Sequence, residues 1–412
     1  MRPMPRRSDV LLRSSRLLRL LLAVLAASAV ATTGCGSPYA ASIVLPPNAP
    51  PRDSIHCGSG RCVQELAAGA YRTCARLSDG SIYCWGNNSR GQLLDGTTTN
   101  SPRPIRVEGM SGVTRLAMGV AHTCALLSDS TVACWGYNTA GQTGHGITSS
   151  GLDAPVRVEG LTEVVSLASG DNHTCALRRD GSLWCWGSNE SGQLGLDRTT
   201  RAQPLPVRLP DVPSIKALAL GSRHTCVLAE SGAVRCWGWR QDLGSQSLPG
   251  ATGLSVGGLF GCALMGDGSA RCWGQNDQGQ LGNGRRSEPS ASLDTVPAPV
   301  VGLDGAVELA SSLTHTCARM ADGSARCWGS NWSGEVGDGS VGERLARTSA
   351  TPVQELSGVV QIVAGGSCVP DGGAHSCALL EDGTVRCWGD NSSGQLGDGT
   401  TEARASPTPM TW

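Results

Sequence analysis

The sequence predicts an all-β protein, a seven-bladed β-propeller with four-stranded blades. A Cys-Trp-Gly triplet, preceded by a second cysteine and a turn signal, recurs seven times along the chain. Successive copies are mostly about fifty residues apart, which suits one four-stranded unit that cannot bury its own faces alone. A propeller buries the faces of such units against their neighbours. The triplets begin at Cys84, Cys134, Cys185, Cys236, Cys272, Cys327 and Cys387.

Each unit contains four short apolar runs between Gly, Pro and Asp breakers, a pattern typical of strands. In one unit these runs span residues 205–208, 215–220, 224–229 and 233–237. At the start of the repeats, segment 62–69 matches the second strand of a unit, and at the end segment 406–412 matches the first. We therefore expect one blade to be completed by both ends of the chain, which closes the ring.

The N-terminal residues 1–34 are typical of a signal peptide, with arginines up to Arg19, an apolar run over 20–30 and small residues before Cys35. The apolar run is too short to span a membrane as a helix. The stretch Thr32-Thr33-Gly34-Cys35 resembles a bacterial lipobox, whose cysteine is acylated, although Thr32 stands where leucine is usual.

Residues 35–61 then form a Pro-rich tether that would hold the propeller, residues 62–412, off a membrane surface. We expect an exported lipoprotein of the outer membrane or cell surface. Cleavage without lipidation, which would give a soluble secreted protein, is the alternative.

The chain has 18 cysteines, and in an exported protein this number indicates disulfides. Most form pairs of identical spacing around a turn signal such as Ser78-Asp79-Gly80, and a hairpin loop centred on Asp79 places Cys74 opposite Cys84. Zinc is the alternative, but each hairpin supplies only two of four ligands. The predicted pairs are Cys74 with Cys84, Cys124 with Cys134, Cys175 with Cys185, Cys226 with Cys236, Cys262 with Cys272, Cys317 with Cys327, and Cys377 with Cys387.

Three further cysteines follow Cys35 outside these pairs. Either Cys57 pairs with Cys62 and Cys368 stays free, or one of the first two pairs with Cys368 across the ring closure.

Two stretches of the repeat resemble a known family: Gly119-x-x-His122-Thr-Cys-Ala-Leu126 and Cys134-Trp-Gly-x-Asn138-x-x-Gly141-Gln142. They look like the regulator of chromosome condensation repeat, and the resemblance implies a seven-bladed propeller. For function it implies several roles, because the founding member is a nuclear guanine-nucleotide exchange factor that also binds chromatin. Other relatives are secreted propellers, including bacterial enzyme inhibitors.

Composition and motifs argue against two classes of function. The chain has 33 basic and 34 acidic residues, and Lys216 is its one lysine, so it lacks the basic patch of a nucleic-acid-binding protein. No Ser-His-Asp arrangement, phosphate loop or HExxH motif is present, and the Asp residues before glycine are turn formers. We expect no enzyme activity and no cofactor.

Histidines at one repeat position could suggest a metal site, but two units carry Arg72 and Phe260 there, which would not preserve a ligand. We expect these histidines to bond to neighbouring backbone. The tryptophans of the triplets are expected to fill equivalent core layers. The histidines are His122, His173, His224, His315 and His375.

The fourth unit departs most from the repeat. After its triplet it reads Trp239-Arg240-Gln241-Asp242-Leu243, and the next cysteine arrives about fifteen residues early, so one strand is shortened or lost. Trp239, Arg240 and, in another loop, Trp332 are residue types that anchor interfaces. The alternative is a degenerate blade with exposed tryptophans. We predict a monomeric, non-catalytic binding or scaffold protein of the cell envelope that recognises a protein or a surface polymer.

Overall fold

The computed structural model describes residues 42–43, 55–56, 62–239, 245–288, 293–342, 345–366 and 373–412. These residues form strands in seven antiparallel sheets, and none of them is helical. The predicted all-β, seven-bladed propeller is confirmed.

Every blade is built from strands that are consecutive in the chain. The blades are numbered here in chain order. Blade 1 is β2–β5 (Val63–Ala68, Arg72–Leu77, Ile82–Gly86, Ser101–Arg106), blade 2 is β6–β9 (Val113–Met118, His122–Leu127, Val132–Asn138, Ser149–Arg157), blade 3 is β10–β13 (Val164–Ser169, His173–Arg178, Leu183–Ser188, Ala202–Arg208), blade 4 is β14–β17 (Ile215–Leu220, His224–Ala229, Ala233–Gly238, Ser245–Ser247), blade 5 is β18–β21 (Ala251–Val256, Phe260–Met265, Ala270–Gly274, Asp294–Pro299), blade 6 is β22–β25 (Ala306–Ser311, His315–Met320, Ala325–Gly329, Arg347–Pro352) and blade 7 is β26–β29 (Val359–Gly365, His375–Leu380, Val385–Gly389, Arg404–Pro409).

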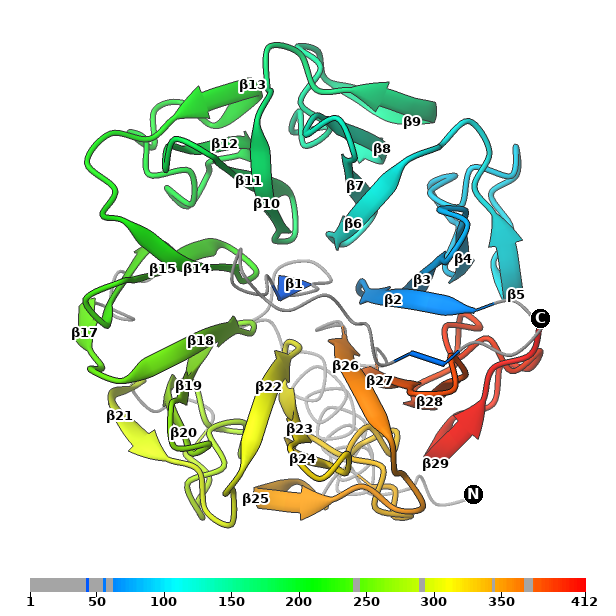
Figure 1. The fold of residues 1–412 in the computed structure, drawn as a ribbon, viewed down its shortest axis with the longest axis vertical. Helices are drawn as coiled ribbons and strands as arrows, with labels where there is room; N and C mark the ends of the chain where they lie inside the picture. The colour runs from blue at the N-terminus through cyan, green and yellow to red at the C-terminus, as the bar shows by residue number, and fades with distance from the viewer. Residues whose placement is uncertain are drawn as a thin grey trace, which may run out of the picture. The chain divides into compact units, whose positions relative to one another are not determined.

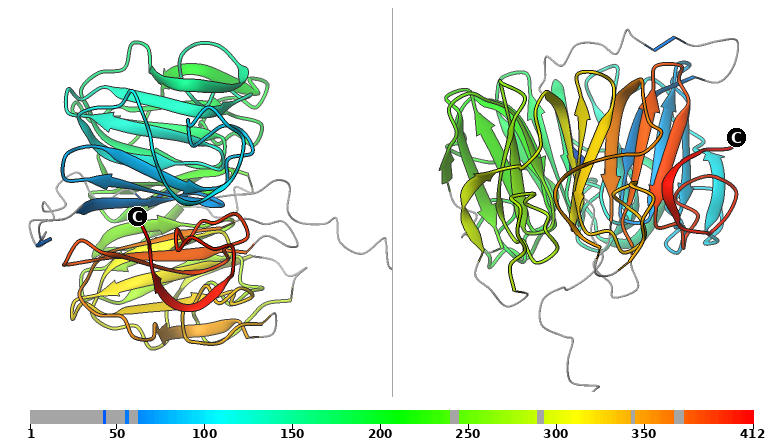
Figure 2. Two further views of the ribbon diagram at one scale, coloured as in Figure 1. Left: turned by 90° about the vertical axis from the view of Figure 1, so that its right-hand side faces the viewer. Right: turned by 90° about the horizontal axis from the view of Figure 1, so that it is seen from below.

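The first strand of each blade lines the centre of the ring, and the fourth lies at the periphery (Figure 1). From the side, the strands run between the two faces of the ring (Figure 2). Each blade therefore turns both sheet faces toward neighbouring blades.

The second and third strands of each blade form the predicted hairpin. In blade 1, Arg76 faces Ile82 and Cys74 faces Cys84, as the loop centred on Asp79 requires. Gly80 at the end of this loop has φ of 79°, a left-handed conformation that favours glycine. The Asp79 carboxylate accepts the Ser81 N–H at 2.9 Å, which stabilises the turn.

The core lies between the blades, and the triplet tryptophans are its largest members. Trp135 of blade 2, for example, packs in one cluster with Cys74, Cys84 and Leu93 of blade 1. Six of these tryptophans are 0% exposed, as expected of core residues: Trp85, Trp135, Trp186, Trp273, Trp328 and Trp388.

The ring closes differently from the sequence prediction, which was wrong to expect one blade shared by both ends. The C-terminal strand β29 pairs with β28 in blade 7, and β2 begins blade 1. The sequence analysis assigned each outer strand to the unit that follows it. In the structure each outer strand pairs with the triplet strand that precedes it, so the predicted blades were shifted by one strand. Blades 1 and 7 meet as whole neighbours: the Leu66 N–H donates to Gln361 Oε1 at 2.8 Å, and Gln361 Nε2 donates to the Leu66 carbonyl at 2.8 Å.

Part of the predicted tether also joins the propeller. Strand β1 (Ser42–Ile43) pairs antiparallel with β14, so that Ser42 faces Leu220 and Ile43 faces Ala219. It lies near the centre of the ring, beside inner strands of other blades (Figure 1). Further along, the His56 N–H donates to the Glu381 carbonyl at 2.7 Å.

Candidate functional site

The histidines of the repeat join neighbouring blades. His122 Nε2 lies 2.9 Å from Thr174 Oγ1 of the next blade, and His173 Nε2 lies 3.0 Å from Thr225 Oγ1. His315 and His375 make the same contact at 2.8 Å and 3.0 Å with Ser376 and Thr73. Their partners are hydroxyls of the next blade, whereas the sequence suggested neighbouring backbone.

Burial keeps these histidines neutral. It is the largest cause that lowers the pKa of His122 to about 3, followed by the charge of Arg72. Burial likewise lowers the pKa of His173, His315 and His375 to about 3 and that of His224 to about 4. These neutral imidazoles therefore have a structural role, because their hydrogen bonds hold neighbouring blades together.

Two blade boundaries lack either the histidine or the hydroxyl residue of this contact, and their hydrogen bonds differ. Arg72 replaces the histidine in blade 1 and donates Nη2 to the carbonyls of Gly119 and His122 in blade 2. In blade 5, Gly261 stands at the position of the hydroxyl residue, and both ring nitrogens of His224 lack a hydrogen-bond partner. Among the described residues, no three His, Cys, Asp or Glu side chains are grouped so that they could hold a metal ion.

The residues predicted to bind a partner are not brought together. Trp239 follows β16 in blade 4, is half-buried, and has the Arg223 guanidinium 5.4 Å from its ring centroid. Trp332 is 41% exposed and lies in the loop after β24, two blades away. Arg240 lies outside the described residues.

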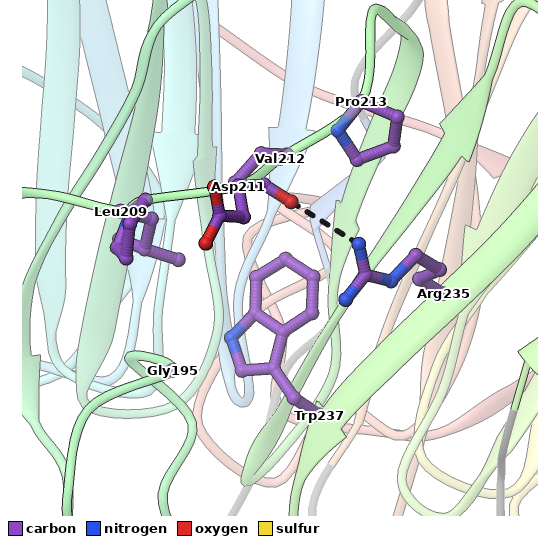
Figure 3. A pocket seen from close by; sticks show the side chains of 8 residues that line it. Gly195, Leu209, Asp211, Val212, Pro213, Arg235 and Trp237 are labelled. Atoms are coloured by element: carbon purple, nitrogen blue, oxygen red, sulfur yellow. Dashed lines mark hydrogen bonds between the residues drawn. The ribbon is translucent and has the colours of Figure 1, made fainter.

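A pocket opens instead around Trp237, the triplet tryptophan of blade 4, which is only partly buried (Figure 3). Its volume is ≈ 170 Å³. Leu209, Val212 and Pro213, from the connection between blades 3 and 4, form the wall that faces the indole. At the rim, Arg235 donates Nη1 to the Asp211 carbonyl at 3.1 Å. The pocket is thus largely apolar, with an aromatic side and a cation at its edge.

The outer strand of blade 4 is described over the three residues of β17, and residues 240–244 before it lie outside the described ranges. β17 faces only Ala233, Val234 and Arg235 of β16. In the other six blades the outer strand continues to face the cysteine and the final glycine of the triplet, as Val207 faces Cys185 and Gln203 faces Gly187 in blade 3. No described residue faces Cys236 or Trp237 across this ladder.

An arginine from the neighbouring blade contacts the third strand of blade 4. Arg198 lies in the loop after β12 and donates Nη2 to the Gly238 carbonyl at 3.1 Å. The glycine that other units carry ten residues after the triplet glycine (Gly96, Gly146, Gly284, Gly339 and Gly399) is replaced in this loop by Asp197, the residue before Arg198. Arg198 therefore joins the loop after β12 of blade 3 to the end of β16 in blade 4.

Sequence reasoning located the irregular blade but assigned Trp237 to the core. The available signal was the shortened spacing after Cys236. The described part of the chain contains no helix that is long and apolar enough to cross a bilayer.

Comparison with known proteins agrees with this architecture. Residues 154–412 match the family model of the RCC1-like domain. Residues 63–92 and 113–142 match one model of the regulator of chromosome condensation (RCC1) repeat, and 79–126 and 129–177 match another.

Two curated relatives and one solved structure show the range of similar proteins. The ultraviolet-B receptor UVR8 of Arabidopsis thaliana is 30% identical over 372 residues, which is 84% of this chain and 81% of the receptor. The probable E3 ubiquitin-protein ligase HERC3 of Homo sapiens is 31% identical over 363 residues, which is 86% of this chain but only 30% of the ligase.

The structure of Prp20p from Saccharomyces cerevisiae, described with its binding properties to Gsp1p and histones, superposes with a TM-score of 0.70 at 23% identity. The match covers 87% of this chain and 88% of Prp20p, and at this identity it shows the fold alone. Together, the repeats, the seven blades and the matched residues show that this chain belongs to the RCC1-like domain family.

Proposed function

We propose that this protein is an exported, monomeric propeller that binds another protein and catalyses no reaction. Membership of the RCC1-like domain family supports a binding or regulatory role, because the similar proteins include a light receptor and a protein studied for its binding to Gsp1p and histones. A surface polymer is the other class of ligand compatible with an envelope location.

The repeated cysteine pairs are the observation that carries the proposed location. In each hairpin the two cysteines face each other, with sulfurs 2.04 to 2.10 Å apart in all seven blades. Cys62 is also disulfide-bonded, to a residue outside the described ranges, and none of the described cysteines is free. Such a framework persists in oxidising compartments. The leader-like residues 1–34 point to the same destination.

We further propose that acylation of Cys35 anchors the protein. The segment that would carry the lipid lies outside the described residues, so the support is the lipobox-like sequence before Cys35. One acyl chain gives only marginal membrane binding, whereas several give stable anchoring. Substitution of Cys35→Ala should move the protein from the membrane fraction to the soluble fraction. Equal partitioning of both forms would contradict the anchor without touching the binding role.

The binding role is tested by crosslinking in the producing cell, followed by purification of the tagged full-length protein. We expect one or a few envelope proteins to be captured reproducibly, and a chain unfolded by reduction before incubation with envelope extract should capture none of them. Recovery of the same set by folded and unfolded chains would contradict specific binding. Acceleration of nucleotide exchange on a small GTPase by the purified protein would replace the proposal with the exchange-factor role.

A further inference from the structure

Three loop positions that are polar in other blades carry large, exposed apolar side chains. Ile147 follows the third strand of blade 2 and is 59% exposed, while Trp332 and Val341 follow the third strand of blade 6 and are 41% and 52% exposed. Because these side chains stay exposed, they add little to the core, and exposed apolar groups of this kind mark a surface that contacts a protein or a membrane. The polar counterparts are Thr97, Arg198, Arg285, Ser340 and Thr400 for Ile147, Ser89, Thr139, Glu190, Asp277 and Ser392 for Trp332, and Thr98, Thr148, Thr199, Arg286 and Thr401 for Val341.

The loop of blade 6 brings its apolar residues close to one another. The Gly342 N–H donates to the Asn331 carbonyl at 3.0 Å, so Val341 and Trp332, their chain neighbours, lie in adjacent parts of the loop. The Leu345 N–H donates to the Gly342 carbonyl at 2.9 Å, and the Leu345 side chain is also exposed. This loop therefore presents a tryptophan and two aliphatic side chains together.

Both apolar loops lie on the same face of the ring. Successive strands of a blade are antiparallel, so the first and third strands run toward one face and the loops that follow them share it (Figure 2). We call this the loop face. A Cβ at Gly373, just before β27, would come within 2.5 Å of Ser333 Oγ in the loop after β24, which shows how closely these segments meet. The hairpin turns and the connections between blades lie on the opposite face.

Strand β1 places the N-terminal side of the chain at the loop face. β1 is antiparallel to β14, and Ser42 faces Leu220, the last residue of β14. Since β14 is the first strand of blade 4 and ends at the loop face, the N-terminal end of β1 is there too. By His56 the chain is at the opposite face, where the His56 N–H donates to the Glu381 carbonyl in the turn between β27 and β28. The inner strands beside β1 include β6 of blade 2 and β22 of blade 6, the two blades with apolar loops.

The length of chain before β1 determines which face a lipid on Cys35 can hold toward a bilayer. Ser42 is the seventh residue after Cys35, and a fully extended chain covers roughly 3.3–3.6 Å per residue, so this stretch spans at most about 25 Å. To reach the opposite face it would have to cross a four-stranded blade and descend a six-residue strand. That path takes roughly 35 Å, at about 4.8 Å per strand and 3.3 Å per residue. An acyl group on Cys35 therefore holds the loop face toward the bilayer.

We propose that the loop face docks on the lipid surface to which Cys35 anchors the protein, with Ile147, Trp332 and Val341 in contact with the headgroup region. Tryptophan suits this boundary, because its indole combines a large apolar body with one N–H. The aliphatic side chains gain free energy when they leave water. This inference rests on the proposed acylation of Cys35, and it assigns the membrane-facing surface of the anchored propeller.

Fluorescence quenching tests the orientation. The full-length protein is purified from membranes of the producing cell and reconstituted on vesicles of phosphatidylethanolamine and phosphatidylglycerol, with or without lipid that carries bromine on its acyl chains. Bromine quenches tryptophans that lie close to it. We expect brominated vesicles to quench part of the emission of the parent protein, and Trp332→Ser should remove most of this quenching. The matched control is Trp412→Ser. Trp412 is 43% exposed but follows β29 to the opposite face, where its ring contacts that of Tyr83 at a centroid distance of 5.3 Å, so this variant should retain the quenching.

Hydrogen exchange gives a second measurement that needs no tryptophan. On vesicles, the amides of residues 330–342 should exchange more slowly than in the Cys35→Ala protein in solution, whereas those of the hairpin turn at 77–81 should exchange equally in both. The triple variant Ile147→Thr, Trp332→Ser, Val341→Thr introduces residue types that other blades carry at these positions, so the fold should be kept. This variant should stay on the vesicles through its anchor but lose the protection of 330–342.

Quenching that is unchanged in Trp332→Ser, quenching that is lost in Trp412→Ser, or equal exchange of 330–342 in both forms would each overturn the docking face, provided that circular dichroism shows an intact fold. The anchor is judged separately, from the partitioning of the parent and of Cys35→Ala. A protein that is anchored through Cys35 but shows no protection of the loop face keeps the anchor and refutes the docking. A protein that does not partition through Cys35 refutes both, and the crosslinking test of partner binding is unaffected in either case.

Discussion

His375 Nε2 lies 3.0 Å from Thr73 Oγ1, a contact that joins the last blade of the chain to the first across 302 residues. The same hydroxyl donates to the Gln395 carbonyl at 2.9 Å, which also accepts the Trp85 indole N–H at 2.9 Å. One threonine thus connects the inner histidine of blade 7 with the loop that covers the tryptophan of blade 1. The same histidine–hydroxyl contact occurs at three other blade boundaries, between His122 and Thr174, His173 and Thr225, and His315 and Ser376. One repeated hydrogen bond thus helps to hold the ring together.

We expect Thr73→Val to lower the free energy of unfolding by about 1–2 kcal/mol, because the buried His375 imidazole loses its partner. The matched control is Thr123→Val. Thr123 has the same repeat position, but its Oγ1 has no hydrogen-bond partner because Arg72 replaces the histidine of the preceding blade. This control should be neutral in urea unfolding, and equal losses in both variants would contradict the role of the contact.

The buried histidines should make the protein less stable as the pH falls below about 6.5. Their folded pKa values are about 3 to 4, against about 6.5 when unfolded, so the unfolded chain binds more protons in this window. Each histidine then contributes a loss of up to about 1.4 kcal/mol per pH unit. Urea unfolding between pH 7 and 5 measures this slope.

The variant His224→Phe serves as its control, because phenylalanine occupies the same position in blade 5 as Phe260 and both nitrogens of His224 lack partners. The pH slope of this variant should be smaller, and its stability at pH 7 should be no lower than that of the parent. Equal stability of the parent at pH 7 and pH 5 would show that the histidines are not buried as described.

The cysteine pairs should appear as seven separate hairpin disulfides. Peptide mapping without reduction should find Cys175 linked to Cys185, whose sulfurs lie 2.07 Å apart, and the corresponding link in each other blade. Replacing both cysteines of one pair by alanine should cost at most about 3 kcal/mol, since the hairpin turn already holds the ends together. Free thiols together with bound zinc would contradict this assignment.

What the sequence predicted well is what all units share. Cys74 opposite Cys84 follows from the turn at Asp79, because one loop sets the register of the whole hairpin. The division into blades was wrong by one strand, since local pattern does not tell which neighbour an outer strand pairs with. The meaning of Arg198 was also out of reach, because its contact with Gly238 exists only after two blades have packed.

Deletion of residues 401–412 should destabilise the protein by removing β29 and Met410. The Met410 N–H donates to the Val385 carbonyl at 3.0 Å, and its side chain belongs to the cluster that covers Trp85. Trp85 is 0% exposed in the complete blade. We expect the melting temperature to fall by about 5 °C or more and the tryptophan emission to shift to the red. Removal of Trp412 alone, which is 43% exposed, is the control and should change the melting temperature little. A truncated protein that melts like the parent would mean that β29 does not complete the blade.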